Sequence, residues 1–537
     1  MNDRLDLLLV NAPSRLGVYG KLSEFAAKEP PVWAGLLARY CLNRGFSVRI
    51  LDAEAEGLNA AETAHKIMTE HRPRLAVFCI YGHQPSASTQ CMPAAEATAR
   101  RLRFEQHSET PTLALGTHPS ALPERTLREG TFDFVCQGEG PSTIESLLLR
   151  LKLRDDIAEL SPSLLVPSGL WYKFQGRNNM QIACGRQAQN ITDLDAELPG
   201  QAWELLDMRR YRAHNWHLWA ARPSNLHEVK VSIKPGGQMT AMTDSRPLPA
   251  GGYASVQTSL GCPYACTFCC INAPFGGRGY RRWSPANVAG QIERLVRTYG
   301  ITNIKIPDEM FVLNREHVVG ICDELINRGL GDALNMWAYA RIDTVKDSAL
   351  LALMRRAGFR WLGVGVESGS KHVRDGVEKG RFGNEEIARS VARIRAEGIA
   401  VGANYIFGLP DDTRASCAET LALACELNTE WANFYCAMAY PGSPLHAEAQ
   451  KRGWPLPEDP GGPGWIGYSQ HAYETLPLPT ETLSAAEVLD IRDTAFMTYF
   501  SRPEYQGMLA ERFGPHAVAE VHRMLAAGRP KRKLLNG

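Results

Sequence analysis

The carboxyl-terminal half of the chain repeats a strand followed by a helix six times, and this repeat constrains the fold most. The predicted strands are apolar runs at residues 253–258, 303–306, 336–341, 361–367, 400–407 and 432–438. Ser284 followed by Pro285 is typical of a helix start, and Gly398 is typical of a helix end. Six such units predict a partial (β/α)6 barrel of the TIM type, whose chemistry lies at the carboxyl ends of its strands.

Residues 1–155 alternate five short β-rich runs with amphipathic helical segments. The strands are predicted at residues 5–10, 46–51, 75–79, 112–115 and 132–136, and the helices at residues 32–43, 60–70, 94–102 and 142–151. This order predicts an α/β domain with a Rossmann-like, doubly wound parallel sheet. Such sheets bind ligands at the carboxyl ends of their strands, where this chain has glycine and small polar residues.

Three cysteines, Cys262, Cys266 and Cys269, form a C-x3-C-x2-C pattern directly after the first predicted barrel strand. Three thiolates in one loop can each hold one iron of a [4Fe–4S] cube, and a fourth iron then stays open for another ligand. A zinc site is an alternative. Structural zinc, however, usually takes four ligands from two pairs of closely spaced residues, and the sequence has no second pair of the type C-x2-C or H-x3-H. Cys270 is a poor fourth ligand because an extended chain turns it away from Cys269.

Composition narrows the class of protein. The 537 residues carry 59 basic and 58 acidic side chains, which gives no electrostatic case for a nucleic-acid partner. No apolar run approaches the ~20 residues that span a bilayer, and the run at residues 7–10 is better explained as a strand than as a signal peptide.

Thirteen cysteines, three of them clustered, predict a cytoplasmic enzyme rather than a disulfide framework. The basic run at residues 529–533 is expected to be a solvated tail.

The cysteine spacing, with an aromatic residue at Phe268, is the signature of the radical S-adenosylmethionine (SAM) enzymes. The amino-terminal third resembles the cobalamin-binding domain that precedes the barrel in many of them, through residues 29–37 and 137–140. The D-x-H-x-x-G loop that places a histidine beneath cobalt in other cobalamin proteins is absent. The resemblance therefore implies base-off cobalamin without a histidine ligand, although His83 and His118 lie at predicted strand ends.

The resemblance also implies a division of the chain. Residues 1–155 would bind cobalamin, residues 156–250 would form a linker, residues 251–445 would form the radical SAM core barrel, and residues 446–537 would form a helical cap. Within the linker, the aromatic segment 214–219 is expected either to pack between the domains and hold them together or to form a wall of the cofactor cavity. Residues 220–246 are expected to form a hairpin or a loop.

Site residues follow from the same resemblance. The cluster would be held by Cys262, Cys266 and Cys269. SAM would be held by polar residues that end the second, third and fourth barrel strands: Asp308, Arg341 and Glu367. Each of these could instead form a salt bridge on the barrel rim. Cobalamin would lie against residues at the last two strand ends of the first sheet: Gly116, Gly138, Glu139 and Gly140. The sequence identifies no catalytic residue.

The combination of modules resembles the class B radical SAM methyltransferases. In that family, a 5′-deoxyadenosyl radical removes hydrogen from an unactivated carbon, and the carbon radical takes a methyl group from methylcobalamin. A small metabolite would be the substrate, and an external flavodoxin or ferredoxin would supply electrons. One alternative is a rearrangement or ring cyclisation without methyl transfer, as in the anaerobic magnesium-protoporphyrin cyclase. A non-catalytic corrinoid carrier or sensor is a remote alternative.

Overall fold

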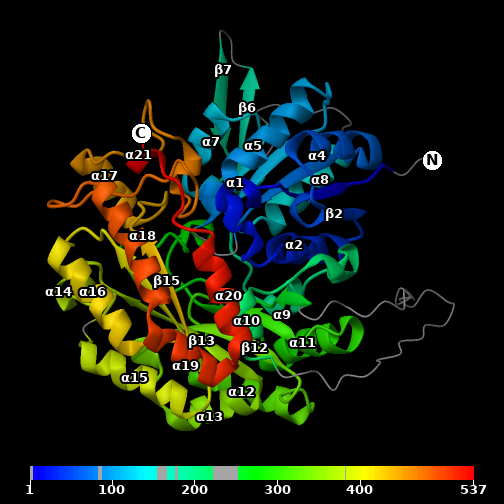
Figure 1. Ribbon diagram of the computed structural model, residues 1–537. Coiled ribbons are helices and arrows are strands. Elements are labelled where there is room, and N and C mark those ends of the chain that lie inside the picture. Colours follow the sequence, from blue (N-terminus) through cyan, green and yellow to red (C-terminus); the bar gives the residue numbers. More distant parts are fainter. Residues whose placement is uncertain are drawn as a thin grey trace.

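A computed structural model of the chain describes residues 4–82, 87–153, 166–175, 179–221, 252–380 and 382–536. Two sheets follow one another along the chain, each covered by helices, and the first sheet lies above the second in Figure 1. This arrangement confirms the predicted fold class, a Rossmann-like sheet followed by a partial barrel and carboxyl-terminal helices. The hairpin expected at residues 220–246 lies almost entirely outside the described residues.

The first sheet has seven strands in the order β2-β1-β3-β4-β5-β6-β7. Five strands are parallel, and their bounds are β1 Leu7–Asn11, β2 Val48–Asp52, β3 Leu75–Ile80, β4 Thr112–Gly116 and β5 Phe134–Cys136. Helices cover both of its faces, which explains why β3 is buried along its whole length. The strand order reverses between β1 and β3, and ligands of open parallel sheets bind at such a point.

Two further strands come from the segment expected to be a linker. They are β6 Leu170–Gln175 and β7 Met180–Cys184, and they extend the sheet in antiparallel fashion from β5. In β6, Leu170 and Tyr172 are buried while the residues between and after them are partly exposed, which is a short two-residue alternation. The domain boundaries expected at residues 155, 250 and 445 stay predictions.

Helices around the first sheet are short except for three. Their bounds are α1 Arg15–Tyr19, α2 Val32–Leu42, α3 Ala53–Glu56, α4 Ala60–Lys66, α5 Ser88–Phe104, α6 Thr117–Ala121, α7 Pro123–Glu129 and α8 Pro141–Leu153. In chain order, α9 Leu194–Glu197 and α10 Asn215–Leu218 come between the strands of the first sheet and those of the second. A 3-10 turn, η1 Gly20–Glu24, follows α1. The expected helices at residues 32–43 and 142–151 match α2 and α8 closely.

The second sheet has six parallel strands in the order β15-β14-β13-β12-β11-β8. Their bounds are β8 Tyr253–Ser255, β11 Asn303–Ile306, β12 Asn335–Arg341, β13 Phe359–Glu367, β14 Ala400–Phe407 and β15 Trp431–Cys436. Among the described strands, β8 and β15 do not pair with each other, so the barrel is open on one side. A small antiparallel pair, β9 Ser259–Leu260 and β10 Arg281–Arg282, brackets the cysteine loop.

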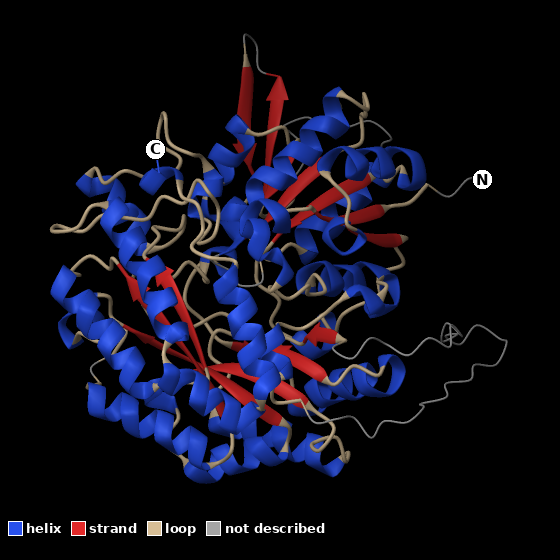
Figure 2. Cartoon of the chain, viewed as in Figure 1, coloured by secondary structure: helices blue, strands red, loops and turns tan. Residues whose placement is uncertain are grey.

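Helices follow the barrel strands and pack outside them, as Figure 2 shows. They are α11 Pro285–Tyr299, α12 Arg315–Asn327, α13 Ser348–Arg356, α14 Lys371–Gly376, α15 Asn384–Ala396, α16 Arg414–Leu427 and α17 Pro444–Arg452. The expected cap is present, because the Ser284 hydroxyl accepts a hydrogen bond from the Asn287 backbone N–H at 3.2 Å.

The carboxyl-terminal region consists of a loop followed by four helices: α18 Ala485–Ser501, α19 Pro503–Phe513, α20 Pro515–Ala526 and α21 Lys533–Asn536. The expectation of a solvated basic tail is wrong for Arg532, whose side chain is fully buried. Arg532 Nε donates to Asp493 Oδ2 of α18 at 2.9 Å, and Arg532 Nη1 donates to the Ala472 carbonyl at 2.9 Å. The burial is possible because a paired guanidinium keeps its charge compensated. No helix among the described residues has the length and apolar character to cross a bilayer.

Buried ion pairs connect the first sheet to the barrel. Glu29, directly before α2, pairs with Lys305 of β11 at 3.1 Å, and the Ser255 hydroxyl donates to Glu29 at 2.9 Å. Glu139, after β5, pairs with Arg281 of β10 and accepts a hydrogen bond from the Ile191 backbone. Removing one partner of a buried pair costs about 3–5 kcal/mol, so these contacts fix how the two sheets are placed.

Candidate functional site

A cavity of about 470 Å³ occupies the interior of the barrel. At one end it is lined by Cys262, Cys266 and Cys269, and along its walls by inward-facing residues of the strands. Side chains of α18 and α20 also line it, so these helices help to close the open side of the barrel. The structure thus brings the three cysteines to the cavity of the barrel, as the sequence predicts.

The cysteine loop is shaped by local contacts. Gly261 has a φ of +83°, and a Cβ there would lie 2.7 Å from the Gly279 carbonyl oxygen. The Asn272 side chain accepts a hydrogen bond from the Cys262 N–H at 3.1 Å and donates to the Cys262 carbonyl at 2.9 Å. Cys270 is buried and does not line the cavity, as expected from its position beside Cys269.

The donor set fits a cube better than a single ion. Among the described residues, no three His, Cys, Asp or Glu side chains are grouped so that they could hold one metal ion. A structural zinc needs its ligands gathered around one point at about 2.0–2.3 Å. A cube instead binds each cysteine at a separate corner. The zinc alternative therefore finds no preformed site within the described part of the chain.

Arg341 lies beside the cysteine loop at the end of β12. Its guanidinium forms two hydrogen bonds with Asp343, at 2.9 and 3.0 Å, and donates to Cys266 Sγ at 3.7 Å. It also lies 4.1 Å from the ring centroid of Tyr264. The guanidinium places its positive charge beside the Cys266 sulfur. Arg341 thus forms a rim salt bridge and also faces the cavity.

Glu367 ends β13 in an unusual backbone conformation. Its φ is +66°, which a non-glycine residue adopts only at a cost of about 1–3 kcal/mol, and the β13–β14 register shifts at this point. Its carboxylate lies 2.6 Å from Lys379 Nζ, and both buried side chains line the cavity. Strain of this kind gathers at functional sites, because the surrounding structure must hold it in place.

Asp308 and its neighbour Glu309 have different environments. The buried Asp308 carboxylate accepts hydrogen bonds from the Thr258 N–H at 2.8 Å, the Thr258 hydroxyl at 2.6 Å and the Ser259 hydroxyl at 2.5 Å. It therefore joins the ends of β8 and β11 and lines neither cavity described here. Glu309 accepts no hydrogen bond from the described residues, and burial raises its pKa to about 7.

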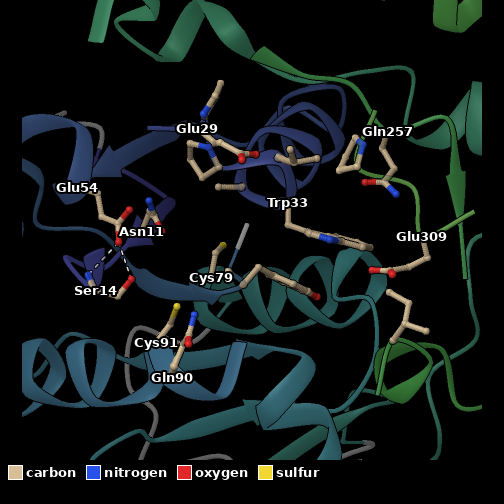
Figure 3. A pocket seen from close by; sticks show the side chains of 18 of the residues that line it. Asn11, Ser14, Glu29, Trp33, Glu54, Cys79, Gln90, Cys91, Gln257 and Glu309 are labelled. Atoms are coloured by element: carbon tan, nitrogen blue, oxygen red, sulfur yellow. Dashed lines mark hydrogen bonds between the residues drawn. The ribbon is translucent and has the colours of Figure 1, made fainter. Parts of the chain in front are cut away.

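A smaller cavity of about 110 Å³ lies between the two sheets (Figure 3). Residues at the carboxyl ends of β1, β2 and β3 line one side, and residues of the barrel, including Gln257 and Glu309, line the other. Trp33 stacks on Tyr81 with ring centroids 5.0 Å apart and planes 11° apart. The Tyr81 hydroxyl is buried without a hydrogen-bond partner among the described residues. Aromatic faces and an unused hydroxyl suit a large flat ligand with polar edges.

Glu309 lines both cavities, as do Tyr19 and Gln90, so the two cavities meet at these residues. On the other side of the small cavity, Glu54 accepts hydrogen bonds from the Ser14 N–H at 3.0 Å and the Ser14 hydroxyl at 2.5 Å (Figure 3). Burial raises the pKa of Glu54 to about 7. Because the Glu309 carboxylate lines both cavities, it can contact a ligand in either of them.

The residues predicted to face the corrin, Gly116, Gly138, Glu139 and Gly140, line neither of the two cavities. A Cβ at Gly116 would lie 2.1 Å from the Ile80 carbonyl oxygen, and one at Gly140 would lie 2.2 Å from Leu115 Cδ1. These glycines allow close packing of the strand ends, and Glu139 pairs with Arg281. Their contact with cobalamin stays a prediction.

The two candidate histidines are placed differently. His83 lies outside the described residues. His118 is buried in α6, with its Nδ1 3.2 Å from the Thr89 hydroxyl and its ring 4.5 Å from that of Trp465. Burial lowers the pKa of His118 to about 3, so the ring is neutral. His118 lines neither cavity, which leaves it a packing residue in this structure.

The aromatic segment 214–219 lines the barrel cavity. The Trp216 ring lies 4.9 Å from Trp361 and 5.3 Å from Trp337, between centroids, and Trp219 lines the same cavity. His217 Nε2 lies 2.8 Å from the Asn335 carbonyl oxygen. The segment is therefore both a wall of the cavity and a packing contact between the linker and the barrel.

Two family models match the chain. The radical SAM superfamily matches residues 256–424, and the B12 binding domain matches residues 22–148. Together the two matched segments cover more than half of the chain. The chain belongs to the radical SAM enzymes with a cobalamin-binding domain. The predicted cofactors, SAM, a [4Fe–4S] cluster and cobalamin, are those of this family.

Individual relatives are distant. An uncharacterized methyltransferase of Pyrococcus horikoshii is 26% identical over 417 residues, which cover 78% of this chain and 77% of the relative. The anaerobic magnesium-protoporphyrin IX monomethyl ester cyclase of Rubrivivax gelatinosus is 26% identical over 430 residues, covering 79% and 67%. The solved radical SAM methyltransferase TsrM from Kitasatospora setae has 16% identity, a TM-score of 0.63, and 98% and 99% of the two chains covered. The last match shows that the chains share a fold.

Proposed function

We propose that this radical SAM enzyme is a cobalamin-dependent methyltransferase that methylates an unactivated carbon of a small metabolite. The observation that carries the proposal is that Glu309 lines both the cysteine-lined barrel cavity and the cavity between the sheets. Methylation of this kind requires the methyl carrier and the radical source to reach one carbon. Two cavities that share Glu309, Tyr19 and Gln90 as lining residues satisfy that requirement.

The residues divide into those that would hold cofactors and those that position them. Cys262, Cys266 and Cys269 would hold the cluster. When bound, the cluster and SAM supply a 5′-deoxyadenosyl radical that removes a hydrogen atom, and methylcobalamin supplies the methyl group. The protein's own part is binding, orientation and exclusion of water.

The polar residues of the barrel rim would bind SAM. Glu309 accepts no hydrogen bond from the described residues, lines the cavity and would accept one from an ammonium group. Arg341 and Glu367 face the cavity, although each already has an ionic partner. Asp308 would act indirectly, because its hydrogen bonds with Thr258 and Ser259 fix the turn that carries Glu309. Gly116, Gly138, Glu139 and Gly140 would shape the edge of the sheet that receives the corrin.

The free cysteines and the balance of charged residues support a cellular compartment and a class of substrate. All thirteen cysteines are free thiols, which supports a reducing cytoplasm as the place of action. An external electron donor of the flavodoxin or ferredoxin type would reduce the cluster. The balance of basic and acidic residues supports a small-molecule substrate rather than nucleic acid.

The test compares two cysteines of the same loop, Cys262 and Cys270, after anaerobic reconstitution with iron, sulfide and cobalamin. The Cys262→Ala variant should lose cluster absorbance and all conversion of SAM to 5′-deoxyadenosine. The Cys270→Ala variant, which removes a buried thiol outside the cavity, should keep both. Deoxyadenosine formation by the Cys262→Ala variant would refute the cluster assignment.

A second candidate is a radical cyclisation or rearrangement without methyl transfer. The similarity to the cyclase of Rubrivivax gelatinosus over 430 residues favours it. With its substrate, the methyltransferase should form S-adenosylhomocysteine together with 5′-deoxyadenosine, whereas the cyclase reaction should form only the deoxyadenosine. A carrier or sensor should form neither product.

A further inference from the structure

The end of the barrel cavity opposite the cysteines is built from tryptophan. This tryptophan base consists of Trp216, Trp219, Trp337, Trp361 and Trp431, all of which line the cavity. Trp361 lies near the start of β13, and Glu367 ends the same strand. At about 3.3 Å per residue, six residues separate the base from the polar end by roughly 20 Å. The cavity therefore runs from a polar, cysteine-lined end to an aromatic end.

The cationic side chains that line the cavity are already compensated. Each lysine and arginine among its described lining residues has a carboxylate partner: Lys305 with Glu29 at 3.1 Å, Arg341 with Asp343 at 2.9 Å, Lys379 with Glu367 at 2.6 Å and Arg492 with Asp493 at 2.6 Å. A phosphate or carboxylate at the aromatic end would find no uncompensated cation among these residues. Burying an unpaired anion is strongly unfavourable, so this end of the cavity disfavours a negatively charged group.

One polar group of the tryptophan base has no partner. The indole N–H of Trp361 is buried and makes no hydrogen bond to the described residues, and the whole side chain is 1% exposed. Three of the other indole groups have acceptors: Trp219 donates to Glu520 at 2.6 Å, Trp337 to the Tyr253 hydroxyl at 3.2 Å and Trp431 to Asn433 at 2.9 Å. An unmatched buried donor is unfavourable, and a ligand that supplies an acceptor removes that cost.

We propose that the substrate is an uncharged, elongated and mostly apolar molecule of the isoprenoid-alcohol type. Its polar end would supply a hydrogen-bond acceptor to Trp361, its apolar body would lie against the aromatic walls, and its reacting carbon would lie near the cysteine end. This inference rests on the proposed function for the reaction, but its binding step does not require methyl transfer. Nucleotides, phosphate esters and carboxylates would bring negative charges that the aromatic end does not match.

The experiment is equilibrium dialysis of the full-length, cofactor-reconstituted protein with tritiated farnesol and, separately, with tritiated farnesyl diphosphate. Farnesol should bind saturably and at least about tenfold more tightly than the diphosphate, since the chains are identical and only the charge differs. This comparison uses the unmodified protein, so it does not depend on whether a variant folds.

A matched pair of variants locates the binding site. The Trp361→Phe variant keeps an aromatic ring but loses the N–H, and it should bind farnesol about fivefold more weakly. The control is Trp203→Phe, because the Trp203 indole N–H is also buried without a partner among the described residues, yet Trp203 lines neither cavity. Its affinity for farnesol should not change.

The outcomes separate this inference from the proposed function. Cofactor loading is measured on the same sample by its absorbance. Loaded protein that does not bind farnesol, or that binds the diphosphate as tightly, would overturn the substrate class and leave the methyltransferase proposal intact. Equal weakening by the two tryptophan variants would also overturn it. Saturable farnesol binding with the expected variant effects supports the inference even if the cluster fails to assemble.

Discussion

The barrel cavity and the cavity between the sheets are built from different kinds of contact. In the barrel, the polar residues at the strand ends are held by ionic partners, such as Glu367 by Lys379. Between the sheets, stacked rings such as Trp33 and Tyr81 form much of the wall. Paired charges fix individual atoms, whereas stacked rings present a surface. The cysteine-lined end of the barrel cavity is thus suited to orient small polar groups, and the cavity between the sheets is suited to receive a broad flat ligand.

The largest expected effect tests the paired charges. Replacing Glu367 alone with leucine leaves the buried ammonium of Lys379 unpaired, so the free energy of unfolding should fall by about 3–5 kcal/mol. The double variant Glu367→Leu with Lys379→Met should regain most of this loss, because no buried charge remains. Urea unfolding followed by circular dichroism measures both. A double variant as unstable as the single one would show that the pair does not act as a unit.

The next effect concerns the strand ends of the first sheet. Gly116→Ala should lower the free energy of unfolding by about 3 kcal/mol, because the new methyl group would lie 2.1 Å from the Ile80 carbonyl oxygen. Gly138→Ala is the control, since its nearest neighbour would be Ala188 Cβ at 3.3 Å and its cost is chiefly that of the positive φ. Equal losses would contradict the steric explanation for Gly116.

A pH measurement tests His118 as a neutral packing residue. Its folded pKa of about 3 lies below the ordinary value of 6.5, so stability is complete above pH 6.5 and is lost as the pH falls toward 3. Between pH 7 and pH 5 the loss due to His118 is about 2 kcal/mol. The His118→Gln variant should lack this part of the acid sensitivity, and His516→Gln, at an exposed position, should retain it. An unchanged pH profile for His118→Gln would exclude a buried neutral ring.

The smallest effect concerns the aromatic wall. Trp33→Leu removes the stacking on Tyr81, which is worth about 1 kcal/mol, so cobalamin should bind about fivefold more weakly. Cluster absorbance should not change, because Trp33 does not line the barrel cavity. Trp454→Leu, a partly buried tryptophan outside both cavities, is the control. Loss of the cluster in Trp33→Leu would mean that the two cavities are not independently built.

The sequence predicts the regular elements well because buried parallel strands are continuous apolar runs. The strands at residues 303–306 and 400–407 are predicted to the residue, and the others differ by a few positions at their ends. The cysteine loop is found from spacing alone, because its three donors lie within eight residues. The β6–β7 hairpin is missed, since its alternation is short and polar residues surround it.

Site residues outside the cysteine loop depend on partners that are distant in the sequence. Asp308 and Glu309 are adjacent carboxylates, and only the hydroxyls of Thr258 and Ser259 decide which one is held and which one faces the cavities. Lys379 lies twelve residues after Glu367, in a loop whose sequence gives no sign of the pairing. Trp33 lies within residues 29–37, which carry the resemblance, but it is not predicted as a site residue. Spacing along the chain reveals none of these contacts.

The ion pair between Glu29 and Lys305 has a consequence for how this protein can be divided. The cobalamin-binding and radical SAM segments are matched separately by family models, which invites exchange of one segment for its counterpart from a relative. Each half, however, supplies one charge of a pair that is buried only when both are present. A chimera that omits either residue would bury the other charge alone. In a chimera, the two segments should therefore be chosen so that the pair formed by Glu29 and Lys305 is kept. A cut placed only between the two family segments does not ensure this.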